Sequence, residues 1–184
     1  HEDLPKQIMD KAWIPYFLRK IISLYTYRYE LKITSQLDGV ISVTKLLCDR
    51  FSLANKNVAL VANFPKIDEM LLLSKKDVVK IPNSICYVGS LFPKRGIKEL
   101  IIALDHTNAT LLLAGKFSDK KFEDELKRLK GWKQVIFFGS LNRQGIVEVL
   151  QKSEIGIVTL HPTQSYLESL PIKLFEYMLA KLPV

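Results

Sequence analysis

The sequence predicts an α/β protein in which a doubly wound parallel sheet follows the end of another α/β domain. After residue 84, short apolar runs alternate with stretches of helical periodicity, and the runs are apolar throughout. Such strands are typical of parallel sheets that helices cover on both faces. A charged stretch without periodicity at 74–77 separates this region from the earlier elements.

The first region is expected to be helical and then α/β. Periodicity predicts helix over residues 5–36, broken near Pro15 because a residue before proline disfavours the helical conformation. A strand over Gly39–Val43, a helix over Leu46–Leu53 and a strand over Val58–Val61 follow. Residues 1–66 are therefore assigned to the C-terminal part of an α/β domain.

We place a linker at residues 67–83 and a Rossmann-like domain at 84–184. The chain opens on His1 without methionine and ends at Val184, where the pattern predicts another strand. We therefore expect a piece of a longer protein, truncated before its last strand and helix. The predicted strands of the second domain are 85–88, 110–114, 135–138 and 155–160, and its helices are 96–105, 119–130, 143–152 and 172–181.

The composition is that of a globular chain. Of its 184 residues, 48% are hydrophobic and 25% are charged, which suits a packed core. Cys48 and Cys86 lack C-x-x-C spacing, so they indicate neither a zinc site nor a redox pair and favour a reducing compartment. No apolar run approaches the roughly 18–20 residues that a membrane span needs. We expect a soluble, cytoplasmic protein.

The net charge of +8 is spread along the chain. Residues 1–82 carry 13 Lys/Arg against 9 Asp/Glu and residues 83–184 carry 14 against 10, so each part contributes +4. This even distribution is typical of solvated surface, with a weak preference for anionic membranes or phosphate-bearing substrates. No RNP or KH signature accompanies it, so we expect no nucleic-acid partner.

A candidate phosphate-binding loop follows the first strand of the second domain. Gly89 allows a close backbone approach, and Lys94 and Arg95 stand just before a predicted helix start. Ligands of open α/β sheets bind at the carboxyl ends of the strands, and helix N-termini favour anions. The alternative is an ordinary turn with two solvated cations. The spacing does not match a P-loop or G-x-G-x-x-G, which disfavours ATP and NAD.

Two glutamates, Glu168 and Glu176, flank the predicted start of the last helix near Pro171. One carboxylate can accept hydrogen bonds from sugar hydroxyls and the other from a ribose. Backbone N–H groups of Ser169 and Leu170, at the helix start, can receive phosphates between them. The alternative is a surface helix that happens to carry two carboxylates.

The two motifs in this order resemble glycosyltransferase family four, whose members are retaining enzymes of the GT-B fold. The resemblance covers nearly the whole chain. In that family, a G-x-L…(K/R)-G loop binds the donor diphosphate, and an E-x7-E motif binds the donor sugar and the ribose. The residues that match are Arg95-Gly96, Glu168, Glu176 and the segment Lys181-Leu182-Pro183-Val184.

The resemblance implies roles for individual residues. Arg95 would bind phosphate, Glu168 the transferred sugar, and Glu176 with Leu141 the nucleoside. A histidine after an apolar strand often lies near the reacting sugar in that family, and His1 is the candidate here, so the expected catalytic residues are His1 and Glu168. The members of the expected phosphate site are Gly89, Ser90, Lys94, Arg95, Ser169 and Leu170.

This sequence departs from the family pattern in the phosphate loop. Ser90 stands where the family often has arginine immediately after the first glycine, and Lys94 is the candidate replacement for that cation. Tyr166-Leu167-Glu168-Ser169-Leu170-Pro171 also lacks the glycine that often follows the first glutamate.

The helix around residues 13–22 mixes aromatic, aliphatic and basic side chains. Two interpretations stay open. Such a helix can lie on an anionic membrane, as a peripheral contact at the inner face of the cell membrane. It can equally pack inside the remainder of the first domain.

The resemblance implies a hexosyltransferase that moves a sugar from a UDP- or GDP-type donor to a glycan or lipid-linked acceptor, in cell-surface polysaccharide biosynthesis. Residues 1–66 would then belong to its acceptor-side domain. The nucleotide sugar would be a co-substrate, with no cofactor and no metal, and this piece alone would be inactive because the GT-B site needs both domains. The alternatives are a nucleotide-sugar 2-epimerase of GT-B fold and a nucleotide-binding module without activity, which Ser90 favours.

Overall fold

The computed structural model describes residues 3–65, 78–163, 166 and 171–184. The described residues fall into two compact units, which we treat separately. The first lies within the ranges His1–Asn63 and Pro162–Leu170, and the second within Phe64–His161 and Pro171–Val184. Most of the expected linker lies outside the described residues, so its bounds stay a prediction.

The first unit begins with two helices, α1 (Leu4–Asp10) and α2 (Tyr16–Thr34). Pro15 is the N-cap residue of α2, as its restricted backbone predicts. The Arg19 side chain stabilises the preceding turn, because its guanidinium donates to the carbonyl oxygens of Ile14 at 2.5 Å and Ala12 at 3.0 Å. The predicted break in the helical region is confirmed.

A parallel strand pair completes this unit. Strands β1 (Val40–Ser42) and β2 (Val58–Leu60) pair in parallel and are joined through helix α3 (Lys45–Ser52), which is a βαβ connection. The N-cap residue of α3 is Thr44, whose hydroxyl accepts the N–H of Leu47 at 3.4 Å.

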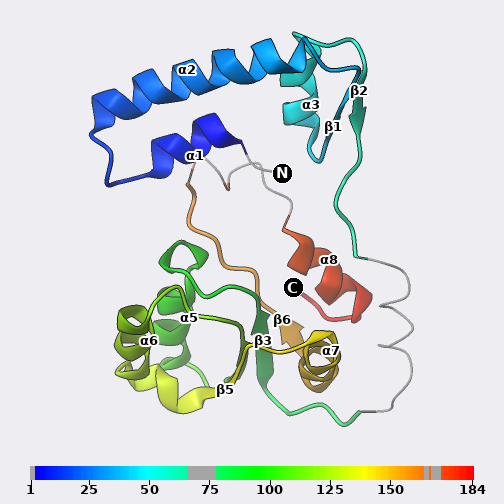
Figure 1. Cartoon of the computed structure of the whole chain (residues 1–184). Coiled ribbons are helices and arrows are strands. Elements are labelled where there is room, and N and C mark those ends of the chain that lie inside the picture. Colours follow the sequence, from blue (N-terminus) through cyan, green and yellow to red (C-terminus); the bar gives the residue numbers. More distant parts are fainter. Residues whose placement is uncertain (1–2, 66–77, 164–165, 167–170) are drawn as a thin grey trace. The chain divides into compact units, whose positions relative to one another are not determined.

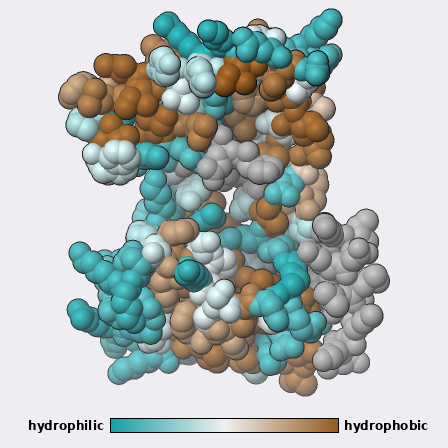
Figure 2. Space-filling model, in the orientation of Figure 1, coloured by the Kyte–Doolittle hydropathy of each residue, from teal (hydrophilic) through white to brown (hydrophobic). Residues whose placement is uncertain are grey.

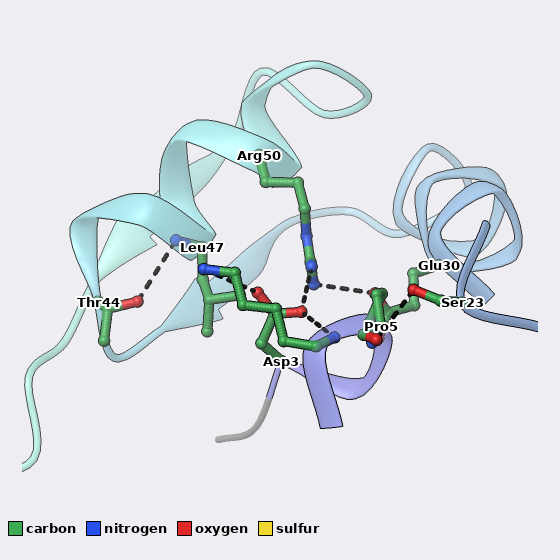
Figure 3. A network of polar contacts seen from close by, with 8 residues as sticks. Asp3, Pro5, Ser23, Glu30, Thr44, Leu47 and Arg50 are labelled. Carbon is green, nitrogen blue, oxygen red and sulfur yellow. Dashed lines mark hydrogen bonds and ion pairs between the residues drawn. The ribbon is translucent and has the colours of Figure 1, made fainter. Parts of the chain in front are cut away.

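An ionic network joins helices α1, α2 and α3 (Figure 3). Arg50 on α3 donates to Asp3, at the start of α1, and to Glu30 on α2, both at 2.9 Å. All three side chains are largely buried. Burial raises the pKa of Glu30, and the positive charge of Arg50 opposes that rise. The guanidinium therefore provides the charge that allows two carboxylates to be buried together.

Helix α2 presents much apolar surface, visible as the brown area over the helical part of the first unit in Figure 2. An exposed apolar surface of this kind is typical of a helix that packs against another part of the protein, a partner or a membrane. The chain's described residues include no helix long and apolar enough to cross a bilayer. The large exposed apolar side chains of this helix are Tyr16, Phe17, Leu18, Ile21, Ile22, Leu24, Tyr25, Tyr29 and Ile33.

The second unit is built on a four-stranded parallel sheet with the order β5-β4-β3-β6. Its strands are β3 (Ser84–Val88), β4 (Thr110–Ala114), β5 (Val135–Gly139) and β6 (Ile155–Gly156). The two central strands, β3 and β4, are the most deeply buried, which explains why their sequences are apolar throughout.

Helices cover both faces of this sheet (Figure 1). Helices α5 (Ile97–Leu104) and α6 (Lys120–Lys127) pack on one face, where Tyr87, Leu111 and Leu113 point. Helices α7 (Arg143–Lys152) and α8 (Ile172–Leu179) pack on the other, against the intervening strand residues. The prediction of a doubly wound, Rossmann-like α/β domain is confirmed.

Most elements of the second unit lie within a residue of their predicted bounds, and the larger differences are at α6, α8 and β6. Helix α6 ends at Lys127 and a 3-10 turn, η2 (Lys130–Gln134), follows, while α8 ends at Leu179. Strand β6 has only two residues instead of the six predicted over 155–160.

The shortening of β6 has a physical reason in the buried side chain of Tyr177. Its hydroxyl accepts the N–H of Val88 at 3.2 Å and donates to the carbonyl oxygen of Ile157 at 3.3 Å. These two backbone groups belong to β3 and to the residue that follows β6. The hydroxyl stands between them and replaces a ladder bond that a longer β6 would make.

Candidate functional site

The candidate phosphate loop begins where β3 ends. Gly89 has a φ of 141°, a backbone conformation that residues other than glycine rarely adopt. Its N–H donates to the carbonyl oxygen of Ala114 at 2.9 Å. Ser90 is exposed, and its carbonyl oxygen accepts the Tyr87 hydroxyl at 3.3 Å. Leu91 is fully buried beneath the loop. The first turn of the loop is therefore held by backbone bonds at the carboxyl end of β3.

The two expected phosphate cations lie in a short 3-10 turn, η1 (Pro93–Arg95). Gly96 adopts the left-handed conformation and starts α5, so no side chain caps this helix. The segment after β6 supports the turn from below, because the Thr159 hydroxyl donates to the carbonyl oxygen of Arg95 at 2.7 Å. In addition, the N–H of His161 donates to the carbonyl oxygen of Lys94 at 3.1 Å.

Helix α8 carries the second part of the candidate site. Pro171 is its N-cap residue, at the predicted start of the helix. Glu176 lies well inside the helix and is half-buried. Its carboxylate forms an ion pair with Arg143, the first residue of α7, at 2.5 Å. Leu141 precedes α7 and packs partly on the same apolar cluster as Tyr177.

Glu176 and Leu141, both predicted to contact the nucleoside, therefore lie on the same face of the sheet. Arg143, two residues after Leu141, forms the ion pair with Glu176. Sequence reasoning missed Arg143. A cation at the start of a helix opposes the helix dipole and signals another partner, but that partner lies 33 residues away in the chain.

Lys173, on the same helix, is the most unusual side chain of the site. It is only 9% exposed, and its Nζ lies 3.7 Å from the centre of the Tyr87 ring. Burial first, and then the charge of Arg95, lower its pKa to about 7, while Glu176 acts in the opposite sense. Sequence reasoning missed this residue as well. The available signal was its spacing, because Lys173 precedes the buried Tyr177 by one helical turn.

The family described as "Glycosyl transferases group 1" matches residues 72–184, which is more than half of the chain and includes both parts of the site. The chain belongs to this family. No match is found among curated proteins.

Several solved structures share the fold of this chain. A mutant of S. aureus TarM, in complex with fondaparinux, alpha-GlcNAc-glycerol and UDP, gives a TM-score of 0.63 at 18% identity, covering 85% of this chain and 31% of that one. WaaG, a glycosyltransferase involved in lipopolysaccharide biosynthesis, gives 0.54 at 21%, covering 78% and 42%. Sucrose-phosphate synthase from Thermosynechococcus elongatus gives 0.57 at 21%, covering 86% and 42%.

At these identities the likeness shows the fold, and the fold of this group 1 transferase chain is of the GT-B type. The chain spans between 31% and 42% of the length of these three structures. What the whole protein does is therefore argued below as a proposal.

Four of the expected site residues, His1, Glu168, Ser169 and Leu170, lie outside the described residues. Their expected roles stay predictions. Nothing in the structure tests the expectation that no metal takes part, and it too stays a prediction.

Proposed function

We propose that this chain is the donor-binding part, with the adjoining end of the acceptor-side domain, of a retaining glycosyltransferase. The enzyme would move a hexose or related sugar from a UDP- or GDP-type donor to a glycan or lipid-linked acceptor. Its place would be cell-surface polysaccharide biosynthesis, in the cytoplasm or peripherally at the inner face of the cell membrane. This piece alone would be inactive.

The observation that carries the proposal is the family match together with the loop after β3. The matched residues contain a strand, a glycine with positive φ and a short turn that holds Lys94 and Arg95. Cations at the carboxyl end of a parallel strand suit a diphosphate. Support for the nature of the substrates comes from the neighbours, one of which was solved with UDP and another of which takes part in lipopolysaccharide biosynthesis.

The proposed chemistry is transfer of a glycosyl group. The bond from the anomeric carbon to the diphosphate oxygen breaks, and its electron pair goes to the diphosphate. An acceptor hydroxyl oxygen forms the new bond on the same face of the sugar, and its proton goes to the departing diphosphate. Arg95, with Lys94, would stabilise the charge that develops on the leaving group, and electrostatic stabilisation of this kind is usually the largest single contribution to catalysis.

The proposal is tested by calorimetric titration of the chain with UDP, GDP and ADP. We expect one uracil or guanine nucleotide to bind, and Arg95→Ala and Glu176→Ala to weaken that binding by about 1–3 kcal/mol, the range for a lost hydrogen bond to a charged group. Lys133→Ala removes an exposed cation elsewhere in the second unit and serves as the control. Equal affinity of all four proteins would contradict the proposed donor site.

Ser90 favours a second candidate, a nucleotide-binding module without activity. It is exposed and carries no charge at the phosphate loop. Nucleotide binding without glycosyl transfer or donor hydrolysis by the full-length protein would support this candidate.

A further inference from the structure

The buried ammonium of Lys173 lies at the phosphate loop. Its Nζ is 3.2 Å from the point where a Cβ on Gly89 would stand, so the glycine leaves the space that the ammonium occupies. The Tyr87 ring contacts it from the end of β3. Lys173 therefore approaches the first turn of the loop from α8, whereas Arg95 belongs to the far end of the same loop.

Within the described part of the chain, no residue accepts a hydrogen bond from the Lys173 ammonium or forms an ion pair with it. Its Nζ lies over the face of the Tyr87 ring instead. An ammonium carries three donors, so this largely buried one can still donate to a bound ligand. The charged groups that act on it are Arg95, which repels it, and Glu176, which attracts it but is paired with Arg143.

A buried ammonium at the first turn of a loop that carries Arg95 at its other end suits an anion with more than one negative charge. The residue that follows Gly89 is Ser90, which supplies no charge, so the first turn of the loop lacks a cation of its own. The ammonium of Lys173 stands at that turn. A diphosphate bound along the loop would meet Lys173 at one end and Arg95 at the other.

We propose that Lys173 is a further donor-binding residue, whose ammonium holds the diphosphate of the nucleotide sugar beside Gly89 while Arg95 holds it at the other end of the loop. This inference rests on the proposed function for the identity of the ligand. The anion-binding role itself rests on the position and burial of the ammonium.

A diphosphate-binding role for Lys173 predicts that ligand binding is coupled to proton uptake. Lys173 titrates near neutral pH because it is buried and faces Arg95, with Glu176 opposing both effects. A diphosphate next to the ammonium favours the charged form, so binding at about pH 8 should take up a proton from solution. A lysine that merely packs on Tyr87 would give no such uptake.

The experiment is calorimetric titration of the chain with inorganic pyrophosphate and with UDP and GDP, at about pH 8, in buffers of different ionisation enthalpy. We expect Lys173→Met to weaken pyrophosphate and nucleotide binding by about tenfold or more and to abolish the proton uptake. The matched control is Lys133→Met, an exposed lysine of η2, which should change neither. The uptake by the unsubstituted chain is informative even if Lys173→Met fails to fold.

The outcomes separate this inference from the proposed function. Nucleotide binding that is equal in the unsubstituted chain and Lys173→Met, without proton uptake, would overturn the role of Lys173 and leave the proposed donor site standing. Pyrophosphate binding that needs Lys173, with no preference for a nucleoside diphosphate, would support the role and contradict the proposed function. Binding of neither pyrophosphate nor nucleotide by the folded, unsubstituted chain would overturn both.

Discussion

At the residue scale, the buried ammonium of Lys173 makes the stability of the folded chain depend on pH. Its pKa is about 7 in the folded chain and 10.5 ordinarily. Below both values the folded chain bears the full cost of a buried charge. Between them the folded chain has lost the proton that the unfolded chain still binds, so stability rises with pH over that window.

We therefore expect Lys173→Met to stabilise the chain. Methionine fills a similar volume without a charge, and replacing buried charged groups by apolar ones can stabilise a protein by about 1–4 kcal/mol. The gain in the free energy of unfolding, measured with urea, should be largest at about pH 6 and should shrink as the pH approaches about 10. A loss of stability at low pH would mean that the charge itself holds the fold, which contradicts a lysine kept for a ligand.

The pair of Arg143 and Glu176 gives a second prediction at this scale. Arg143 orients the carboxylate that is proposed to bind the ribose. We expect Arg143→Ala to weaken UDP or GDP binding by about 1 kcal/mol, less than Glu176→Ala, because the carboxylate stays but is no longer held.

A double-mutant cycle measured by calorimetry checks this. The two effects should fall short of additivity by about 0.5 kcal/mol or more, since the residues are in contact. Full additivity would show that Arg143 acts on the nucleotide independently of Glu176.

At the element scale, the attachment of α8 to the sheet depends on one hydroxyl. Tyr177 is fully buried and bridges Val88 and Ile157. Burial raises the pKa of this phenol far above its ordinary value, so it stays protonated and keeps donating. Because Lys173 and Glu176 share the helix, this bridge also positions both site residues.

We expect Tyr177→Phe to lower the free energy of unfolding by about 1–3 kcal/mol, because it leaves a buried N–H and a buried carbonyl without their partner. Urea unfolding measures the effect. Tyr25→Phe, at a tyrosine that is 67% exposed, is the control and should change it little. Equal effects of the two substitutions would contradict the bridging role.

At the scale of the whole molecule, the two units differ in how much they bury. The second unit contains two apolar clusters, one on each face of its sheet. Leu111, Leu112 and Leu113 are inaccessible to solvent. In the first unit, α2 exposes most of its large apolar side chains. Local stability follows the density of buried apolar contacts, so the units should open independently.

Hydrogen exchange followed by mass spectrometry tests this difference. We expect the amides of β3 and β4 to be the slowest to exchange, and those of α2 and β1 to exchange at least about tenfold faster, since opening them exposes little additional apolar surface. Similar protection of both units would contradict the prediction and would indicate that α2 is covered in solution.

The sequence by itself determined the class of fold and the place of the phosphate loop. Continuous apolar runs, the break at Pro15 and the Gly89–Arg95 loop are local patterns, and local patterns follow from the periods of helix and strand. The tertiary structure decided which distant side chains meet, namely Lys173 with Tyr87 and Arg143 with Glu176. It also decided that β6 ends early, because the Tyr177 hydroxyl takes the place of a strand bond. Such contacts depend on how α8 packs on the sheet, and no spacing along the chain encodes that packing alone.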